Sequence, residues 1–243
     1  PDSYHRDDEL KDQIVEHFRF NLARMVQIAR DADAEIVFVT PSSNLKDSSP
    51  FKSENRANIS SKAKAKWNAA YDKGLSHAKD GRHKLALAAF TQAAAIDDQH
   101  ANLHFEIGRT LFTQKRYPEA TKAFRRAREE DVCPLRALTE MSTIVRDIAG
   151  NSDSPLVDFE AIVSGETLKT HGHNIPGREL FLDHVHPTIE GHKLLAVAII
   201  ERLAEQGIVG ASSGWKNGVV PRVAKKVEAS LFPERRAGAL RNL

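Results

Sequence analysis

Residues 74–93 read GLSHAKDGRHKLALAAFTQA, and residues 108–127 read GRTLFTQKRYPEATKAFRRA. The two stretches are offset by 34 residues, and small or aromatic residues coincide at several positions. The coincident pairs are Gly74 and Gly108, His83 and Tyr117, Ala86 and Ala120, Phe90 and Phe124, and Ala93 and Ala127. A period of this length is typical of arrays in which each unit is one helical hairpin.

These positions and this period resemble the tetratricopeptide repeat. In that arrangement we expect the glycines and alanines to let the two helices of a unit approach closely, and the phenylalanines to fill the space between neighbouring units. The proline that usually closes each unit is replaced by Asp98 and Val132, with Pro134 two residues late. The resemblance implies a protein or peptide partner; the alternative is an unrelated four-helix segment.

Two repeats are fewer than usually stand alone, so their open ends need a cover. The segment from Leu135 to Ala149 predicts an amphipathic helix, which we expect to act as that cap. Its apolar positions are Leu135, Leu138, Met141, Ile144, Val145 and Ile148. The repeats are therefore predicted to be an insertion that rests on another domain.

The segments on both sides of the repeats have the same order of elements. Helical spacing of apolar residues from Ile14 to Ala29 precedes the continuous apolar run 36–40, and the helix after the repeats precedes the run 155–159. Continuous apolar runs are typical of parallel strands buried on both faces. The sequence thus predicts an α/β fold with parallel strands near 36–40 and 155–159, interrupted by an all-α insertion.

A polar loop rich in histidine follows the second predicted strand and ends in Asp183-His184-Val185-His186-Pro187. On a tight turn, an acid three residues before a histidine can reach the far ring nitrogen and fix its tautomer. An apolar helix is expected after this loop, and α/β folds place chemistry where a strand ends before such a helix.

The Asp183-x-x-His186-Pro187 block resembles the last conserved block of the SGNH (GDSL-type) serine hydrolases. Residues 40–53, TPSSNLKDSSPFKS, resemble the stretch after the fourth strand in bacterial SGNH-like proteins that carry inserted tetratricopeptide repeats. The resemblance covers about residues 7–206 and implies a flavodoxin-like layer that hydrolyses esters by serine acyl transfer. It implies His186 as general base, Asp183 as its orienter, an acyl-ester substrate, and no metal or organic cofactor.

The family's nucleophile, oxyanion glycine and asparagine blocks have no match in this chain. Ser3 follows too few residues to form the strand that must present a nucleophile. Ser42 and Ser43 lack the sharp glycine-flanked turn of a nucleophile elbow, and turn hydrogen bonds explain them better. We therefore expect a C-terminal fragment of an ester hydrolase that is inactive alone. The alternative function is a non-catalytic repeat scaffold that binds peptides.

Other readings of the loop residues remain open. Five of the eleven histidines lie between positions 171 and 192, and the pairs His171/His173 and His184/His186 suit a zinc site, although no second acidic cluster accompanies them. The alternative to the general-base role of His186 is a structural one, in which its ring packs under the following helix. His184 is expected to face solvent or to line the mouth of the site as a substrate contact, rather than to act in catalysis. The loop after the first strand offers three polar side chains that either contact substrate or are solvated: Asn44, Lys46 and Lys52.

We divide the chain into hydrolase-like residues 1–58, repeats 59–133, hydrolase-like residues 134–206 and a basic tail 207–243. From Trp215 onward the chain has seven basic residues and only two acidic ones. We expect these charges to form a solvated helix face rather than a surface that binds an anionic partner. The basic residues are Lys216, Arg222, Lys225, Lys226, Arg235, Arg236 and Arg241. A further helix is expected to open at Ser230 or Pro233, so the chain reads as a piece of something longer.

The composition is that of a globular protein. Of 243 residues, 41% are hydrophobic and 28% charged, which excludes collagen-like, mucin-like and wholly disordered chains. No apolar run reaches the roughly 18 residues of a transmembrane helix. The formal net charge of +2 gives no general nucleic-acid or membrane signal, and the single Cys133 excludes an internal disulfide. Nothing in the composition indicates a compartment.

Overall fold

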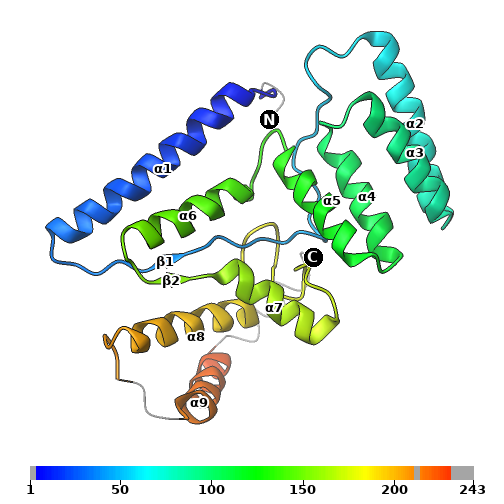
Figure 1. The fold of residues 1–243 in the computed structure, drawn as a ribbon. Coiled ribbons are helices and arrows are strands. Elements are labelled where there is room, and N and C mark those ends of the chain that lie inside the picture. Colours follow the sequence, from blue (N-terminus) through cyan, green and yellow to red (C-terminus); the bar gives the residue numbers. More distant parts are fainter. Residues whose placement is uncertain (1–3, 211–213, 231–243) are drawn as a thin grey trace. The chain divides into compact units, whose positions relative to one another are not determined.

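The computed structural model describes residues 4–210 and 214–230 (Figure 1). The chain divides into two compact units, Pro1–Gly191 and His192–Leu243, which are described separately. Helices make up 63% of the described residues, and their sheet has only two strands. The predicted α/β hydrolase layer is therefore wrong, and the fold is a mostly helical one of the tetratricopeptide-repeat kind.

The two apolar runs that suggested a sheet form only short strands. β1 (Phe38–Val39) pairs in parallel with β2 (Leu156–Val157), with Phe38 opposite Leu156 and Val39 opposite Val157. A sheet that buries both faces needs several neighbouring strands, and the described residues supply only this pair. The apolar side chains of these runs pack into helical clusters instead: Phe38 lies with Val26, Val145 and Ala149.

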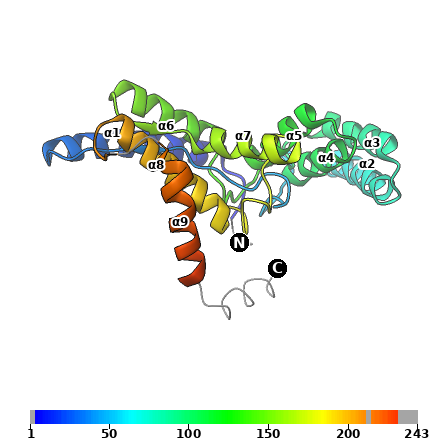
Figure 2. The ribbon, with the colours of Figure 1, turned by 90° about the horizontal axis from the view of Figure 1, so that it is seen from below.

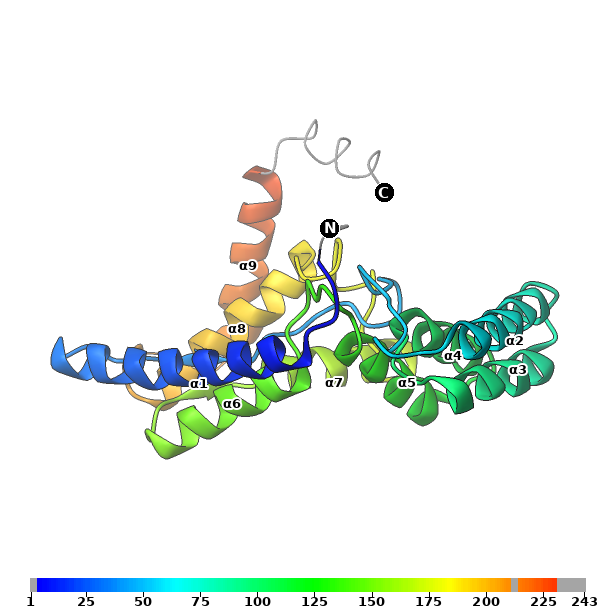
Figure 3. The same cartoon turned by 90° about the horizontal axis from the view of Figure 1, so that it is seen from above.

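The repeats are two antiparallel helical hairpins. α2 (Ser61–Lys79) packs on α3 (His83–Ile96), and α4 (Ala101–Thr113) packs on α5 (Tyr117–Glu129), as Figures 1 and 3 show. Gly81 turns the first hairpin at a φ of 72°, and Lys115 takes the equivalent left-handed conformation in the second at 58°. Glycine adopts this conformation without strain, whereas lysine does not, so the second turn is held by the helices around it.

The glycines of the repeats are contact points for phenylalanine rings. A Cβ atom built on Gly74 would lie 2.3 Å from Cε1 of Phe90, and one built on Gly108 would lie 2.7 Å from Cδ1 of Phe124. Each ring therefore fills the space inside its own hairpin, rather than only the space between units as expected. Phe90 also belongs to a cluster with Leu103 of the next hairpin, so the same ring joins the two units.

The cap of the repeats is not the helix that the sequence suggested. α6 (Thr139–Asn151) packs along α1 (Asp8–Asp31), as Figure 3 shows, and its Ile144 and Val145 lie in clusters with α1. The apolar interior of α4 and α5 is covered instead by Leu45 and Ile175, which come from two loops. The repeats thus end against irregular segments that also carry the polar residues singled out above.

The remaining helices are α7 (Phe159–His171), α8 (Ile189–Glu205) and α9 (Trp215–Ser230). In the second unit, an ion pair between Lys216 and Glu201 joins α9 to α8, the two helices that Figure 2 shows in orange tones. In the described ranges no helix has the length and apolar character needed to cross a membrane. The helix expected beyond Ser230, with Arg235, Arg236 and Arg241, lies outside those ranges.

The close contact of Gly74 with Phe90 predicts the effect of one methyl group. We expect Gly74→Ala to lower the free energy of unfolding by about 1–3 kcal/mol, because the added Cβ overlaps the fully buried ring. Gly165→Ala is the matched control: this exposed site in α7 has open space, so the change should stabilise by ~0.5–1 kcal/mol. Urea unfolding followed by circular dichroism measures both, and equal effects would contradict the packing account.

Candidate functional site

The first candidate site is the turn that carries Asp183 and His186. The Oδ2 atom of Asp183 lies 2.7 Å from Nδ1 of His186, while Oδ1 accepts hydrogen bonds from the backbone N–H groups of Val185 and His186 at 2.8 and 2.9 Å. The backbone N–H of Leu182 donates to the carbonyl of His186, and that of Thr188 to the carbonyl of Leu180. These bonds close a tight turn that fixes the imidazole against the carboxylate.

The electrostatics of this turn favour an ionised carboxylate. Partial burial acts to raise the pKa of Asp183, but the backbone N–H groups of His186 and Val185 and then the imidazole outweigh it and lower the pKa to about 2. The side chain of His186 is 73% exposed. Among the described residues nothing occupies its Nε2 atom, so an ionised acid orients one ring nitrogen and leaves the other available to a proton donor.

The loop after β1 is tied to this turn. The backbone N–H of Asn44 donates to the carbonyl of His184 at 3.0 Å, and Nε2 of His184 lies 3.1 Å from the carbonyl oxygen of Ser49. Arg136 is 3% exposed, and its Nη1 donates to the carbonyls of Asn44 and Ser48, both at 3.0 Å. A buried guanidinium thus binds backbone of the loop, and desolvation lowers its pKa to about 10.

The three side chains expected either to contact substrate or to be solvated, Asn44, Lys46 and Lys52, all have polar partners in the chain. The amide of Asn44 is 1% exposed, and its Oδ1 accepts from the backbone N–H of Asp47 at 3.0 Å, which is a turn-forming bond. Nζ of Lys46 lies 2.6 Å from Asp47 and 2.8 Å from Glu179. Nζ of Lys52 lies 3.2 Å from Glu54. The structure therefore places Asn44 and His184 next to each other in the backbone network that supports the His186 turn.

The histidines of the loop do not converge. His173 is buried, with its ring centroid 4.9 Å from that of Phe112, and its Nδ1 accepts from the backbone N–H of Ile175. Desolvation lowers the pKa of His173. The ring of His171 is 6.1 Å from that of His173 and faces Thr170. No group of three or more histidine, cysteine, aspartate or glutamate side chains in the described residues has a metal-binding arrangement.

The ends of the two strands are closed by an ion-pair network. Oγ1 of Thr40 donates to Oδ1 of Asp158 at 3.0 Å and accepts from the backbone N–H of Glu160. The guanidinium of Arg146 bridges Asp158 and Glu160, with donor–acceptor distances of 2.8–3.0 Å. Burial acts to raise the pKa of Asp158, but the hydrogen bond from Arg146 prevails and lowers it. This network starts α7 and holds it beside the strand ends.

Among the serines considered as nucleophiles, Ser43 has an environment that the sequence did not predict. It is 5% exposed, and its hydroxyl has no hydrogen-bond partner among the described residues, so the turn bonds expected from the sequence do not explain it. Ser42 is half-buried beside it, and both line a small pocket against α5. Ser3 lies outside the described residues.

The second candidate site, which the sequence analysis missed, is the charged surface of the repeats. Residues 59–133 contain fourteen lysines and arginines, of which thirteen are exposed. They contain nine aspartates and glutamates, of which only four are exposed. The exposed surface of this segment is therefore far more basic than the small net charge of the whole chain indicates.

Three of the five acids that are not exposed are buried as hydrogen-bond acceptors. Asp97 accepts from Asn55 and from the backbone N–H of Arg56, and Asp131 accepts from the backbone N–H groups of Phe51 and Lys52 at 2.7 and 2.9 Å. Glu130 pairs with Arg6 at 2.8 Å and with Arg126 at 2.7 Å. These acids attach residues 51–56 and the segment before α1 to the repeats, and buried carboxylates need such partners.

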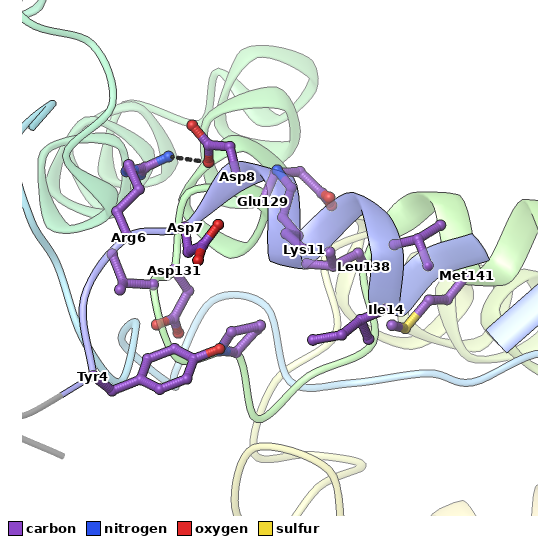
Figure 4. Close-up of a pocket in the computed structure, with 13 residues that line it drawn as sticks. Tyr4, Arg6, Asp7, Asp8, Lys11, Ile14, Glu129, Asp131, Leu138 and Met141 are labelled. Atoms are coloured by element: carbon purple, nitrogen blue, oxygen red, sulfur yellow. Dashed lines mark hydrogen bonds and ion pairs between the residues drawn. The ribbon is translucent and has the colours of Figure 1, made fainter. Parts of the chain in front are cut away.

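A pocket near the start of α1 belongs to the same attachment. Figure 4 shows Tyr4, Arg6 and Asp131 at one end and the apolar side chains of Ile14 and Met141 at the other. The dashed line joins Nη1 of Arg6 to Asp8 at 3.2 Å. Nη2 of Arg6 also donates to the backbone carbonyls of Gln99 and Glu130, so this arginine joins the segment before α1 to the repeats.

Comparison with known proteins identifies one part of the chain. Residues 77–134 match the family model of the tetratricopeptide repeat. Neither the curated proteins nor the solved structures gave a match, and no comparison supports the resemblance to SGNH hydrolases. The matched segment includes the last residues of α2 and the whole of α3, α4 and α5, so the family model and the helical hairpins agree. The predicted tetratricopeptide repeats are therefore confirmed, and they support protein interaction as the role of this segment.

Proposed function

We propose that the tetratricopeptide repeats bind an acidic segment of a protein partner. The observation that carries this proposal is the imbalance of exposed charge on residues 59–133, where thirteen basic side chains face outward with four acidic ones. A surface of one sign attracts a partner of the other sign, speeds their encounter and disfavours partners of like charge.

α2 presents the clearest part of this surface. Lys62, Lys66 and Lys73 are exposed and form no ion pair with any described residue. Residues four and eleven apart on an α-helix lie within about 40° of each other, so the three lysines share one side of α2. Trp67 and Gly74, which are buried against α3, lie on a different side of the helix. The three ammonium groups are thus free to meet carboxylates of a partner.

A labelled octaglutamate peptide tests this function. We expect the chain to bind it, and the Lys62→Gln/Lys66→Gln/Lys73→Gln variant to bind about tenfold more weakly at low salt, because three exposed charge pairs of ~0.5 kcal/mol each sum to about one decade in Kd. Fluorescence anisotropy measures the affinities, and the difference should shrink as salt screens the charges.

The matched control removes three charges from α9. Arg222, Lys225 and Lys226 are also exposed, and their replacement by glutamine changes the net charge equally. This variant should bind octaglutamate as the unchanged chain does. A role for the repeats would be contradicted if the α9 variant bound octaglutamate more weakly than the unchanged chain. It would also be contradicted if the α2 and α9 variants bound the peptide equally well.

We propose ester hydrolysis as a second function, supported by the 2.7 Å contact between Asp183 and His186. In this proposal Nε2 of His186 takes the proton of a serine hydroxyl, and the oxygen attacks the ester carbonyl. The protonated imidazole then returns that proton to the leaving alcohol, and water releases the acyl group by the same two proton transfers. Asp183 holds the ring in the required tautomer. The serine is not identified among the described residues.

Hydrolysis of p-nitrophenyl acetate by the natural full-length protein tests the second function. We expect His186→Gln to lower kcat/KM at least a hundredfold, which is the usual contribution of a general base. His171→Gln, which changes an exposed histidine without a carboxylate partner, should leave the rate unchanged. If the protein hydrolyses the ester no faster than its His186→Gln variant, the second function is wrong and the repeats remain as a binding module.

A further inference from the structure

We propose that the small pocket between α5 and the loops at residues 42–45 and 174–176 receives one oxygen atom of a side-chain carboxylate of the acidic partner, because the pocket has free volume for about one water-sized atom. This inference rests on the proposed binding function and names the place where the partner is anchored. Its polar lining residues are Ser42, Ser43, Arg125, Arg128, Glu160, Ser164 and Asn174.

Ser43 is the unsatisfied donor of the pocket. Its hydroxyl is buried and has no partner in the described part of the chain, although buried polar groups almost always have one. The hydroxyl can donate to an oxygen atom that enters the pocket. Ser43 is a conspicuous exception in a loop whose neighbour Asn44 has its side-chain oxygen, backbone N–H and carbonyl all bonded.

Two arginines supply positive charge at the pocket. Arg125 is exposed and forms no ion pair with a described residue. Arg128 is 3% exposed, and its Nε and Nη2 atoms are engaged by Glu129 and Thr139, which fixes the orientation of its guanidinium. Arg125 therefore supplies the unengaged guanidinium, whose paired N–H donors match the geometry of a carboxylate.

The other polar groups of the lining are engaged with one another or with their neighbours. Oδ1 of Asn174 lies 3.3 Å from Oγ1 of Thr121, whose hydroxyl donates to the carbonyl of Tyr117 at 2.9 Å, and Oγ of Ser164 donates to the backbone carbonyl of Asn174. Glu160 is the one acid among the lining residues, and its Oε2 atom already accepts from Arg146 at 2.8 Å. The negative charge of Glu160 disfavours a doubly charged phosphate more strongly than a singly charged carboxylate. We therefore assign the pocket to an aspartate or glutamate side chain of the partner.

Variants of the two least engaged pocket groups test the inference, with octaglutamate as the probe. Arg125→Gln should weaken binding about tenfold, whereas Arg24→Gln, which removes an exposed charge from α1, outside the repeats, should leave it unchanged. Ser43→Ala should weaken binding three- to fivefold without lowering Tm, because the hydroxyl it removes has no partner in the free protein. Ser142→Ala removes another buried unpartnered hydroxyl, away from the pocket, and should leave binding unchanged.

The results of these experiments distinguish failure of the pocket proposal from failure of the proposed binding function. If the unchanged chain binds octaglutamate but Arg125→Gln and Ser43→Ala bind as well as their controls, the pocket is not the anchor, and the basic surface of the repeats still stands. If the unchanged chain does not bind the peptide, the proposed function fails and the pocket assignment fails with it. Thermal unfolding of each variant shows whether weaker binding reflects a lost contact or a lost fold.

Discussion

The contact of a phenylalanine ring with a glycine Cα is the constraint on which the repeats depend. Phe90 lies on Gly74 and Phe124 lies on Gly108, at distances that leave no room for a side chain on either glycine. This contact brings the two helices of each hairpin together and sets the position of the next hairpin through Leu103. It also determines where α4 and α5 expose apolar surface, which Leu45 and Ile175 then cover.

The covering loops link the repeats to both candidate sites. Leu45 follows Asn44, whose backbone is bonded to the His184 carbonyl and to the buried Arg136. The same loop carries Ser43 and lines the pocket against α5. The burial of acids in the attachment of residues 51–56 has a further consequence, since it leaves the outer surface of the repeats basic. Packing and charge are thus consequences of one arrangement: a short helical array closed by irregular segments.

Much of this arrangement could be predicted from the sequence, because the repeat period is a local pattern. The coincident glycines, alanines and phenylalanines predicted the hairpins, and the spacing of Asp183 and His186 predicted a contact that the turn makes at 2.7 Å. The sheet was mispredicted for a physical reason. An apolar run such as residues 36–40 has the same composition whether it is one strand of a layer or a short pair packed on helices, because strand neighbours are set by tertiary structure.

The basic surface could not be found from composition, since nine acids lie among the fourteen basic residues of the repeats and only tertiary contacts show which acids are buried. The central claim is that this surface receives an acidic partner. Amide chemical-shift mapping of the ¹⁵N-labelled chain during titration with octaglutamate tests it most directly. The account predicts shifts that concentrate on α2–α5 and around Ser43. Shifts that concentrate on α1, α6 or α9, or no shifts at all, would contradict it.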